Sequence, residues 1–161
     1  MNLLTVTSLY AKWTPKLFTV TFDSNGGPDI SADVPSQDVS CETALVEPVL
    51  PDYKGYRFDG WFTDTDCTEP FDGFGNTYTR EFTLYAKWTK AWKVTLKLYD
   101  GADDIVLYVE EGKKLNKPAD PDREHYVFAG WYSDPARTTA WNDFDSVLTD
   151  DVILYAKWTE E

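Results

Sequence analysis

The five residues Leu-Tyr-Ala-Lys-Trp occur three times in this chain, at residues 9–13, 84–88 and 154–158. Self-similarity at a fixed spacing identifies the structural unit, and it separates scaffold residues from candidate sites before any single residue is interpreted. The second and third copies set a period of about seventy residues. The chain is therefore predicted to be a tandem repeat in which each unit ends at one copy of this motif.

The repeated motif has the alternation of a β-strand, with Leu84, Ala86 and Trp88 on one face and Tyr85 and Lys87 on the other. Residues 18–22, 56–62 and 92–98 also alternate or are rich in aromatic and β-branched residues, and residues 39–41 form a further candidate strand. No segment has the length and periodicity of a useful helix. The predicted fold class is mainly β, α+β at most, with tandem small modules of antiparallel strands.

The motif copies divide the chain into three predicted segments. Residues 1–14 match only the end of a unit and are interpreted as the C-terminal remnant of an upstream repeat, expected to dock on the next unit or fray. Residues 15–89 form repeat module 1 and residues 90–161 form repeat module 2. Only Thr89, Lys90 and Ala91 separate Trp88 from Trp92, so the joint is predicted to be too short for free motion between modules.

The two modules align with one change of offset. From Val39 and Val109 onward the offset is seventy residues, whereas the first strands align with an offset of seventy-four, so module 1 has four more residues in its first hairpin. Insertions in a surface hairpin cost little.

Composition excludes several functional classes. The formal net charge is −13, which opposes binding to nucleic acid or to anionic lipid, since both need a basic surface. The apolar runs are much shorter than the roughly twenty residues of a membrane-spanning helix, so no membrane insertion is expected. Aromatic residues make up 16% of the chain and provide the packing that modules of this small size need.

Three ordered motifs identify what the repeat resembles. They are Val-Thr-Phe-Asp-Ser-Asn-Gly-Gly at 20–27, Gly-Tyr-Arg-Phe-Asp-Gly-Trp-Phe at 55–62, and Leu-Tyr-Ala-Lys-Trp at 84–88. With these motifs the chain resembles the B repeat of listerial internalins, also called the Listeria-Bacteroides repeat. Module 2 departs from the pattern at residues 99–104 and at His125, where module 1 has Gly55.

The resemblance implies β-grasp-like, ubiquitin-like modules and a place on the bacterial cell surface or outside the cell. In that family the repeat is commonly a spacer or adhesion segment, and no catalytic residues carry over. The positions shared by the two modules are expected to form the structural repeat core: Tyr56, Phe58, Gly60, Trp61, Leu84, Trp88, Tyr126, Phe128, Gly130, Trp131, Leu154 and Trp158.

The seven tryptophans allow two interpretations. Exposed rings stack on sugars, so a glycan platform is one of them. Trp92 and Trp141, however, align with Phe18 and Phe71, and the other tryptophans align with one another. A position that is aromatic in both modules is typical of a repeated core, so core packing is favoured over glycan contact.

Cys41 and Cys67 occur only in module 1, because Glu111 and Arg137 occupy the equivalent positions of module 2. Two cysteines that are both present in one module and both absent from the other predict a disulfide, which an exported protein permits. Two free thiols are the alternative. No zinc site is expected, because there is no Cys-x-x-Cys spacing and the single His125 is in the other module.

No cofactor, metal or catalytic residue is predicted. The acidic residues at 100–104, 143–145 and 150–151 offer oxygen ligands for calcium, but they lack the spacing of an EF-hand loop, so solvated loop charge is favoured. The chain has one His, no phosphate-binding glycine loop and no nucleophile elbow, which argues against an enzyme.

The sequence thus predicts a non-catalytic structural module of a bacterial surface or secreted protein, an extended stalk in adhesion whose partners are the neighbouring repeats of the same chain. The alternative is a binding module for a host glycan or protein.

Overall fold

The computed structural model describes residues 10–99 and 101–161, and every regular element within them is a strand. The predicted mainly β fold class is confirmed. In chain order the strands are β1 (Phe18–Asp23), β2 (Gln37–Val39), β3 (Tyr56–Phe62), β4 (Phe82–Lys97), β5 (Ile105–Glu110), β6 (Tyr126–Tyr132) and β7 (Val152–Glu160).

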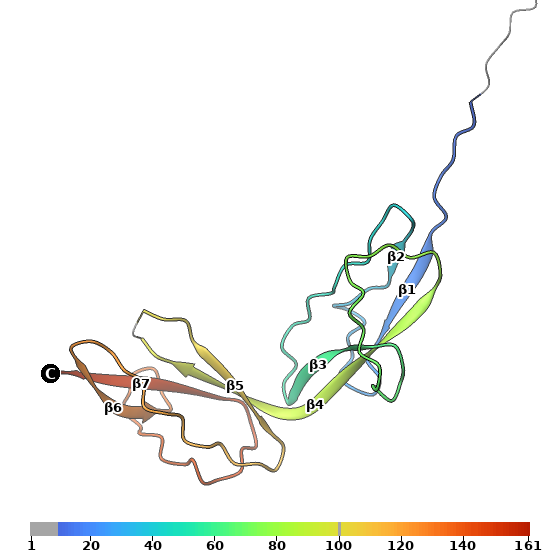
Figure 1. Ribbon diagram of the computed structural model, residues 1–161. Helices are drawn as coiled ribbons and strands as arrows, with labels where there is room; N and C mark the ends of the chain where they lie inside the picture. Colours follow the sequence, from blue (N-terminus) through green and yellow to red (C-terminus); the bar gives the residue numbers. More distant parts are fainter. Residues whose placement is uncertain (1–9, 100) are drawn as a thin grey trace, which may run out of the picture.

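Two separate hydrophobic cores form, one on each side of the middle of β4. Val20, Trp61 and Leu84 belong to the first core, in what we call unit one. Trp131 and Leu154 belong to the second, in unit two. The units lie end to end along β4, which bends where it passes from one to the other (Figure 1).

Each unit places its first and last strands side by side in parallel. Phe22 of β1 lies beside Leu84 of β4, and Leu96 of β4 lies beside Leu154 of β7. The other strand pairs, β1–β2, β3–β4, β4–β5 and β6–β7, are antiparallel. The sheet is therefore mixed, and the expectation of antiparallel strands holds for only part of it. A parallel pair needs a long connection between its strands, and the irregular segments between the first and last strands of each unit provide it.

The second strand has the predicted length but lies two residues earlier, at Gln37–Val39 in place of residues 39–41. It ends at Val39 instead of continuing to Cys41. The reason is local, because the buried Ser40 hydroxyl accepts hydrogen bonds from the backbone N–H groups of Glu42 and Thr43, both at 3.1 Å. A serine that bonds the backbone two and three residues ahead stabilises a turn in place of a ladder.

Gly60 and Gly130 mark a β-bulge in each unit. The register between β3 and β4 shifts between Phe58 and Gly60, and the same shift occurs between Phe128 and Gly130. Their φ angles of 123° and 114° are ones that side-chain-bearing residues rarely adopt. The bulge lets the aromatic residues before and after it, Phe58 and Trp61 in unit one, pack against the same core, which explains why both glycines belong to the repeated pattern.

Residues 10–17 have no regular structure and lead away from β1 (Figure 1). Tyr10 is 90% exposed and Trp13 is 87% exposed, so this part of the predicted remnant does not dock on unit one. The remaining residues of the remnant, 1–9, lie outside the described part of the chain.

Because the two cores are separate, Trp61→Ala and Trp131→Ala are each expected to unfold mainly the unit that contains the substitution. Both indoles are 3% exposed, and truncating a buried Trp costs about 3–5 kcal/mol, most of what a small module has. Amide NMR spectra of each variant will show which unit loses its dispersed signals. Val127→Thr is the matched control on β6, since Val127 is 49% exposed. Unchanged spectra in both Trp variants would contradict the assignment of these rings to the cores.

Candidate functional site

The joint between the units is a continuous piece of β4 that changes its antiparallel partner. Lys90 pairs with Tyr56 of β3, and the next residue, Ala91, pairs with Glu110 of β5. The Ala91 N–H also donates to the Gly55 carbonyl at 3.1 Å. Residues 89–91 are therefore strand, which corrects the prediction of a short linker. Thr89, Lys90, Ala91 and Trp92 each have a strand partner, so strand pairing is continuous through the joint.

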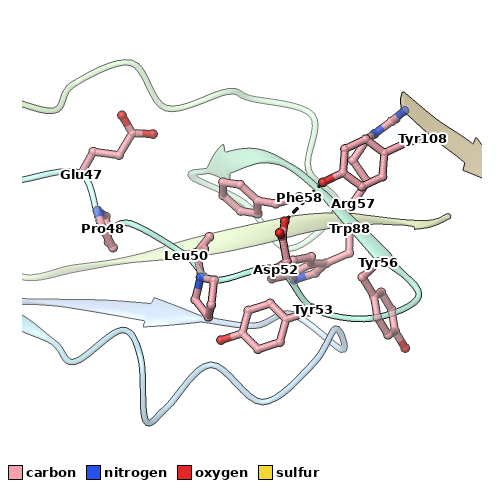
Figure 2. Close-up of a pocket in the computed structure, with 11 residues that line it drawn as sticks. Glu47, Pro48, Leu50, Asp52, Tyr53, Tyr56, Arg57, Phe58, Trp88 and Tyr108 are labelled. Carbon is pink, nitrogen blue, oxygen red and sulfur yellow. Dashed lines mark hydrogen bonds between the residues drawn. The ribbon is translucent and has the colours of Figure 1, made fainter. Parts of the chain in front are cut away.

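A pocket of about 280 Å³ opens beside this joint (Figure 2). Its walls combine aromatic rings from unit one with one tyrosine from β5 of unit two. The lining residues are Glu47, Pro48, Leu50, Pro51, Asp52, Tyr53, Tyr56, Arg57, Phe58, Trp88 and Tyr108. Tyr108 is the one lining residue that belongs to unit two, so both units contribute to the pocket.

The ring packing in this pocket is set by Trp88. Tyr53 and Phe58 lie 5.5 and 5.1 Å from the Trp88 ring, measured between ring centroids. The Trp88 indole N–H donates to the Ser24 carbonyl at 3.0 Å, and the equivalent Trp158 donates to the Leu98 carbonyl at 2.6 Å. The repeated Trp thus ties the closing strand of each unit to the residue that follows its first strand.

Charged groups cross the joint in two places. The Lys54 Nζ of unit one lies 2.8 Å from Asp150 Oδ1 and 3.0 Å from Asp150 Oδ2 of unit two. Lys93 of β4 forms an ion pair with Asp52, and the Tyr108 hydroxyl donates to Asp52 Oδ1 at 3.5 Å, the bond drawn dashed in Figure 2. Each unit contributes both a cation and an anion, so the two contact faces are complementary in charge.

These pairs fix the protonation states at the joint. The hydrogen bond to Asp150 raises the pKa of Lys54, and the same bond lowers the pKa of Asp150. The hydrogen bond to Asp52 raises the pKa of Lys93, and burial followed by the charge of Asp52 raises the pKa of Tyr108. All four shifts move titration further from neutral pH. A general acid or base works best with a pKa near the working pH, so this geometry suits structure and not proton transfer.

Tyr53 shows the same tendency. Burial and a hydrogen bond of 2.6 Å to Asp33 Oδ2 raise the pKa of Tyr53 to about 12. Its hydroxyl is thus already engaged within unit one. Tyr53, Trp88 and Tyr108 of the pocket therefore all have a hydrogen-bond partner for the polar end of the ring.

The residues predicted to form the repeat core fall into two equivalent sets. Trp61, Leu84, Trp131 and Leu154 are buried, whereas the remaining aromatic members are partly buried. Tyr56, Phe58 and Trp88 also line the joint pocket, a second role that the sequence did not predict. Among the seven tryptophans only Trp13 is fully exposed.

Sequence reasoning missed the joint residues Asp52, Lys54, Lys93, Tyr108 and Asp150. A usable signal existed in the alignment of the two units. Lys54 falls on Glu124, and Arg80 falls on Asp150, so both positions of one ion pair reverse their charge between units. Positions that differ in this regular way within a repeated pattern indicate contacts between units more than contacts within them.

Both cysteines are free, so the predicted disulfide is not formed in this structure. Cys41 is exposed and follows the turn at Ser40. Cys67 is partly buried in the loop after β3, where its Sγ lies 3.3 Å from the Asn25 side-chain nitrogen. The alternative of two thiols describes the structure, and the two thiols sit in different surroundings.

We therefore expect two alkylatable thiols that react at different rates. Cys41 should be labelled first under native conditions, since access controls thiol labelling, and Cys67 should be labelled several times more slowly because it is partly buried. Mass spectrometry of the native protein after timed alkylation will count the labels. Cys41→Ser is the control, as it should leave only the slow reaction. A native mass two units below that of the reduced protein would show a disulfide instead.

Within residues 10–99 and 101–161, no group of three or more His, Cys, Asp or Glu side chains is placed to hold a metal ion. Asp100, part of one predicted acidic cluster, lies outside the described residues. In the described part of the chain no helix is long and apolar enough to cross a membrane.

The fold defines a class of protein: small β modules in tandem, here two units that share the strand β4. The family model of the Listeria-Bacteroides repeat domain matches residues 18–87 and again residues 93–157. This chain belongs to the Listeria-Bacteroides repeat family, as the three motifs of unit one indicated.

Similar proteins include two from Evansella cellulosilytica. The chain is 36% identical over 155 residues to a protein named "Putative membrane protein", covering 94% of this chain and 22% of that protein. It is 35% identical over 153 residues to a "Putative Gly-rich membrane protein", and the match covers 93% of this chain and 17% of that protein. Internalin H of Listeria monocytogenes is 36% identical over 84 residues, and the match covers 52% of this chain and 14% of internalin H. The chain thus spans about a fifth of the length of the two Evansella proteins.

Proposed function

We propose that this chain is an extended, non-catalytic spacer of a bacterial cell-surface or secreted protein, used as a stalk in adhesion. The observation that supports this role most strongly is β4, a strand of 16 residues that belongs to both units. A shared strand keeps the two units end to end, because a fold-back would break the hydrogen bonds of Lys90 and Ala91 on either side of the joint.

Contacts outside the strand add to this rigidity. The Lys54–Asp150 pair and the Lys93–Asp52 pair each link a residue of unit one to a residue of unit two, and two such links oppose rotation of one unit against the other. A single exposed ion pair contributes little energy. We therefore propose that the shared strand holds the two units together and that the ion pairs orient them relative to each other.

The proposed location at the cell surface or outside the cell is supported by the names of the proteins that contain similar repeats. The related proteins have names that include membrane proteins and an internalin, and this chain matches only a fraction of each. A spacer needs other domains at its ends, and its nearest partners are neighbouring repeats. The formal net charge of −13 favours a solvated stalk over contact with nucleic acid.

A binding module for a host glycan or protein is the second candidate, and the aromatic pocket of Figure 2 is the observation in its favour. Sugars stack on aromatic rings, and Asp52 and Glu47 at the rim offer acceptors for sugar hydroxyls. A glycan array together with titration of the Tyr108→Ala variant tests it. Binding that this variant abolishes would support the second candidate.

The spacer role predicts one shared, anisotropic tumbling time for the two units, because the continuous strand leaves no free joint. Nitrogen-15 relaxation will measure it for each unit, and small-angle scattering will give a maximum dimension close to two unit lengths. The matched control is a chain with four Gly-Ser residues inserted between Lys90 and Ala91, which should tumble as two bodies with shorter correlation times. Equal behaviour of the two chains would remove the mechanical basis of the spacer role.

A further inference from the structure

Each unit has an exit half, which contacts the next unit along the chain, and an entry half, which contacts the preceding unit. The exit half of unit one consists of Lys54 and Gly55, and the entry half of unit two consists of Trp92 and Asp150. Lys54 pairs with Asp150. Gly55 lies under Trp92, because a Cβ placed on Gly55 would stand 3.6 Å from the Trp92 ring. Unit two has its own exit half in Glu124 and His125, and unit one has its own entry half in Phe18 and Arg80.

The backbone shows that the two exit halves are equivalent. The Tyr56 N–H donates to the Tyr53 carbonyl at 3.0 Å, and the Tyr126 N–H donates to the Arg123 carbonyl at 3.1 Å. Both turns then use a positive φ, 80° at Gly55 and 66° at His125. The carbonyl of this residue accepts an N–H from the closing strand's extension in both units, from Ala91 at 3.1 Å and from Glu161 at 3.3 Å. Glu124 therefore stands where Lys54 stands.

The charges of the outer halves are reversed relative to the joint. Glu124 replaces Lys54 on the exit side, and Arg80 replaces Asp150 on the entry side. An exit half of the unit-two type facing an entry half of the unit-one type would thus pair Glu124 with Arg80. Joining two like units would instead place Lys54 against Arg80, or Glu124 against Asp150, and like charges in contact are unfavourable.

The sizes of the packing residues also differ between the joint and the outer ends, with the larger residue on the opposite half. The joint sets Gly55, which has no side chain, against the large Trp92 ring. The outer halves offer His125 and the smaller Phe18 ring. A Cβ at the Gly55 position would already touch the Trp92 ring, so the ring of a His there would have to fit beside Trp92, and a Gly facing Phe18 would leave space unfilled. Charge and size therefore favour the same pairing of unit types.

We propose that the outer ends of this chain favour units of the opposite type, so that the two types of unit alternate along the array. The partner at the start of unit one is a repeat with an acidic residue at the Glu124 position and a side chain at the His125 position. The partner at the end of unit two is a repeat with a basic residue at the Arg80 position. This proposal rests on the proposed role as a spacer array, and it adds the rule by which units are ordered.

The exposed segment at 10–17 fits this partner. It repeats the end of a closing strand, and Trp13 stands where Trp88 and Trp158 stand. Those two indoles pack in their units, whereas Trp13 is 87% exposed and Leu17 is 57% exposed. An upstream repeat would cover both, just as unit one covers Trp88. The second ion pair does not recur at this end, because Thr19 stands at the Lys93 position and its hydroxyl donates to Asp38 at 2.9 Å. The charge pairing at the outer joint therefore rests on Glu124 and Arg80.

The existing joint can be converted into each possible joint. Lys54→Glu alone reproduces a contact between two units of the second type, and Asp150→Arg alone reproduces a contact between two units of the first type. The double variant K54E/D150R reproduces the proposed Glu124–Arg80 contact. The readout is hydrogen exchange of the Ala91 amide, which donates across the joint to Gly55, with the Leu84 amide in the core of unit one as the internal control.

Each single variant should exchange the Ala91 amide about two- to fivefold faster than the wild type, a range typical of one exposed ion pair, and the double variant should restore the wild-type rate. The Leu84 amide should not change. Equal Ala91 rates in all four proteins would overturn the charge rule. Shared tumbling of the units in those proteins would leave the spacer role intact, so the two failures are distinguishable.

A four-unit chain tests the partner itself. Residues 1–158 are followed directly by residues 14–161 of a second copy, so that Trp158 takes the place of Trp13. The Leu17 amide of the second copy should become at least tenfold more protected than in the present chain. Glu124→Lys in the first copy should reduce this protection two- to fivefold, and Arg80→Glu in the second copy should restore it. Absence of Leu17 protection, or protection independent of these charges, would overturn the proposal.

Discussion

The structure depends on one strand that forms hydrogen bonds for two units. Within β4, Lys90 pairs toward unit one and Ala91 pairs toward unit two, with no residue between them. Strand pairing fixes direction and register, so the placement of each unit follows from that of the other. A module of about seventy residues buries too little surface to be strongly stable alone, and a neighbour that continues its strand extends its sheet at no cost in loop entropy.

Much of this fold was predictable because the repeat acts as an internal alignment. Alternation identified residues 18–22, 56–62 and 84–88 as strands, and shared aromatic positions identified Trp61 and Trp131 as core. The parallel pairing of first and last strands was missed, since alternation reports which face a residue occupies and not which strand lies beside it. The continuity of β4 was missed because residues 89–91, Thr-Lys-Ala, contain neither a turn residue that would end a strand nor a pattern that would predict one.

The joint contacts were beyond single-residue reasoning for a different physical reason. Asp52 and Lys54 look like ordinary loop charges, and only the register of β4 brings them to Lys93 and Asp150. The expected disulfide is not formed in this structure, where both thiols are free. Cys41 and Cys67 share a unit, but one lies beyond β2 and the other lies beside Asn25. Co-occurrence of two cysteines is a weak substitute for a distance between them.

Core and joint positions obey different constraints, which explains how identical scaffolds acquire distinct ends. Leu84 and Leu154 are identical because a change in a close-packed core is costly wherever the unit stands in the array. An exposed pair such as Lys54–Asp150 contributes little to the stability of either unit, so its charges can be exchanged or reversed without unfolding anything. The same weakness means that one pair cannot exclude a wrong neighbour by itself. Discrimination becomes effective when charge and size act together at every joint of a covalent array, where the neighbour is already held at high effective concentration.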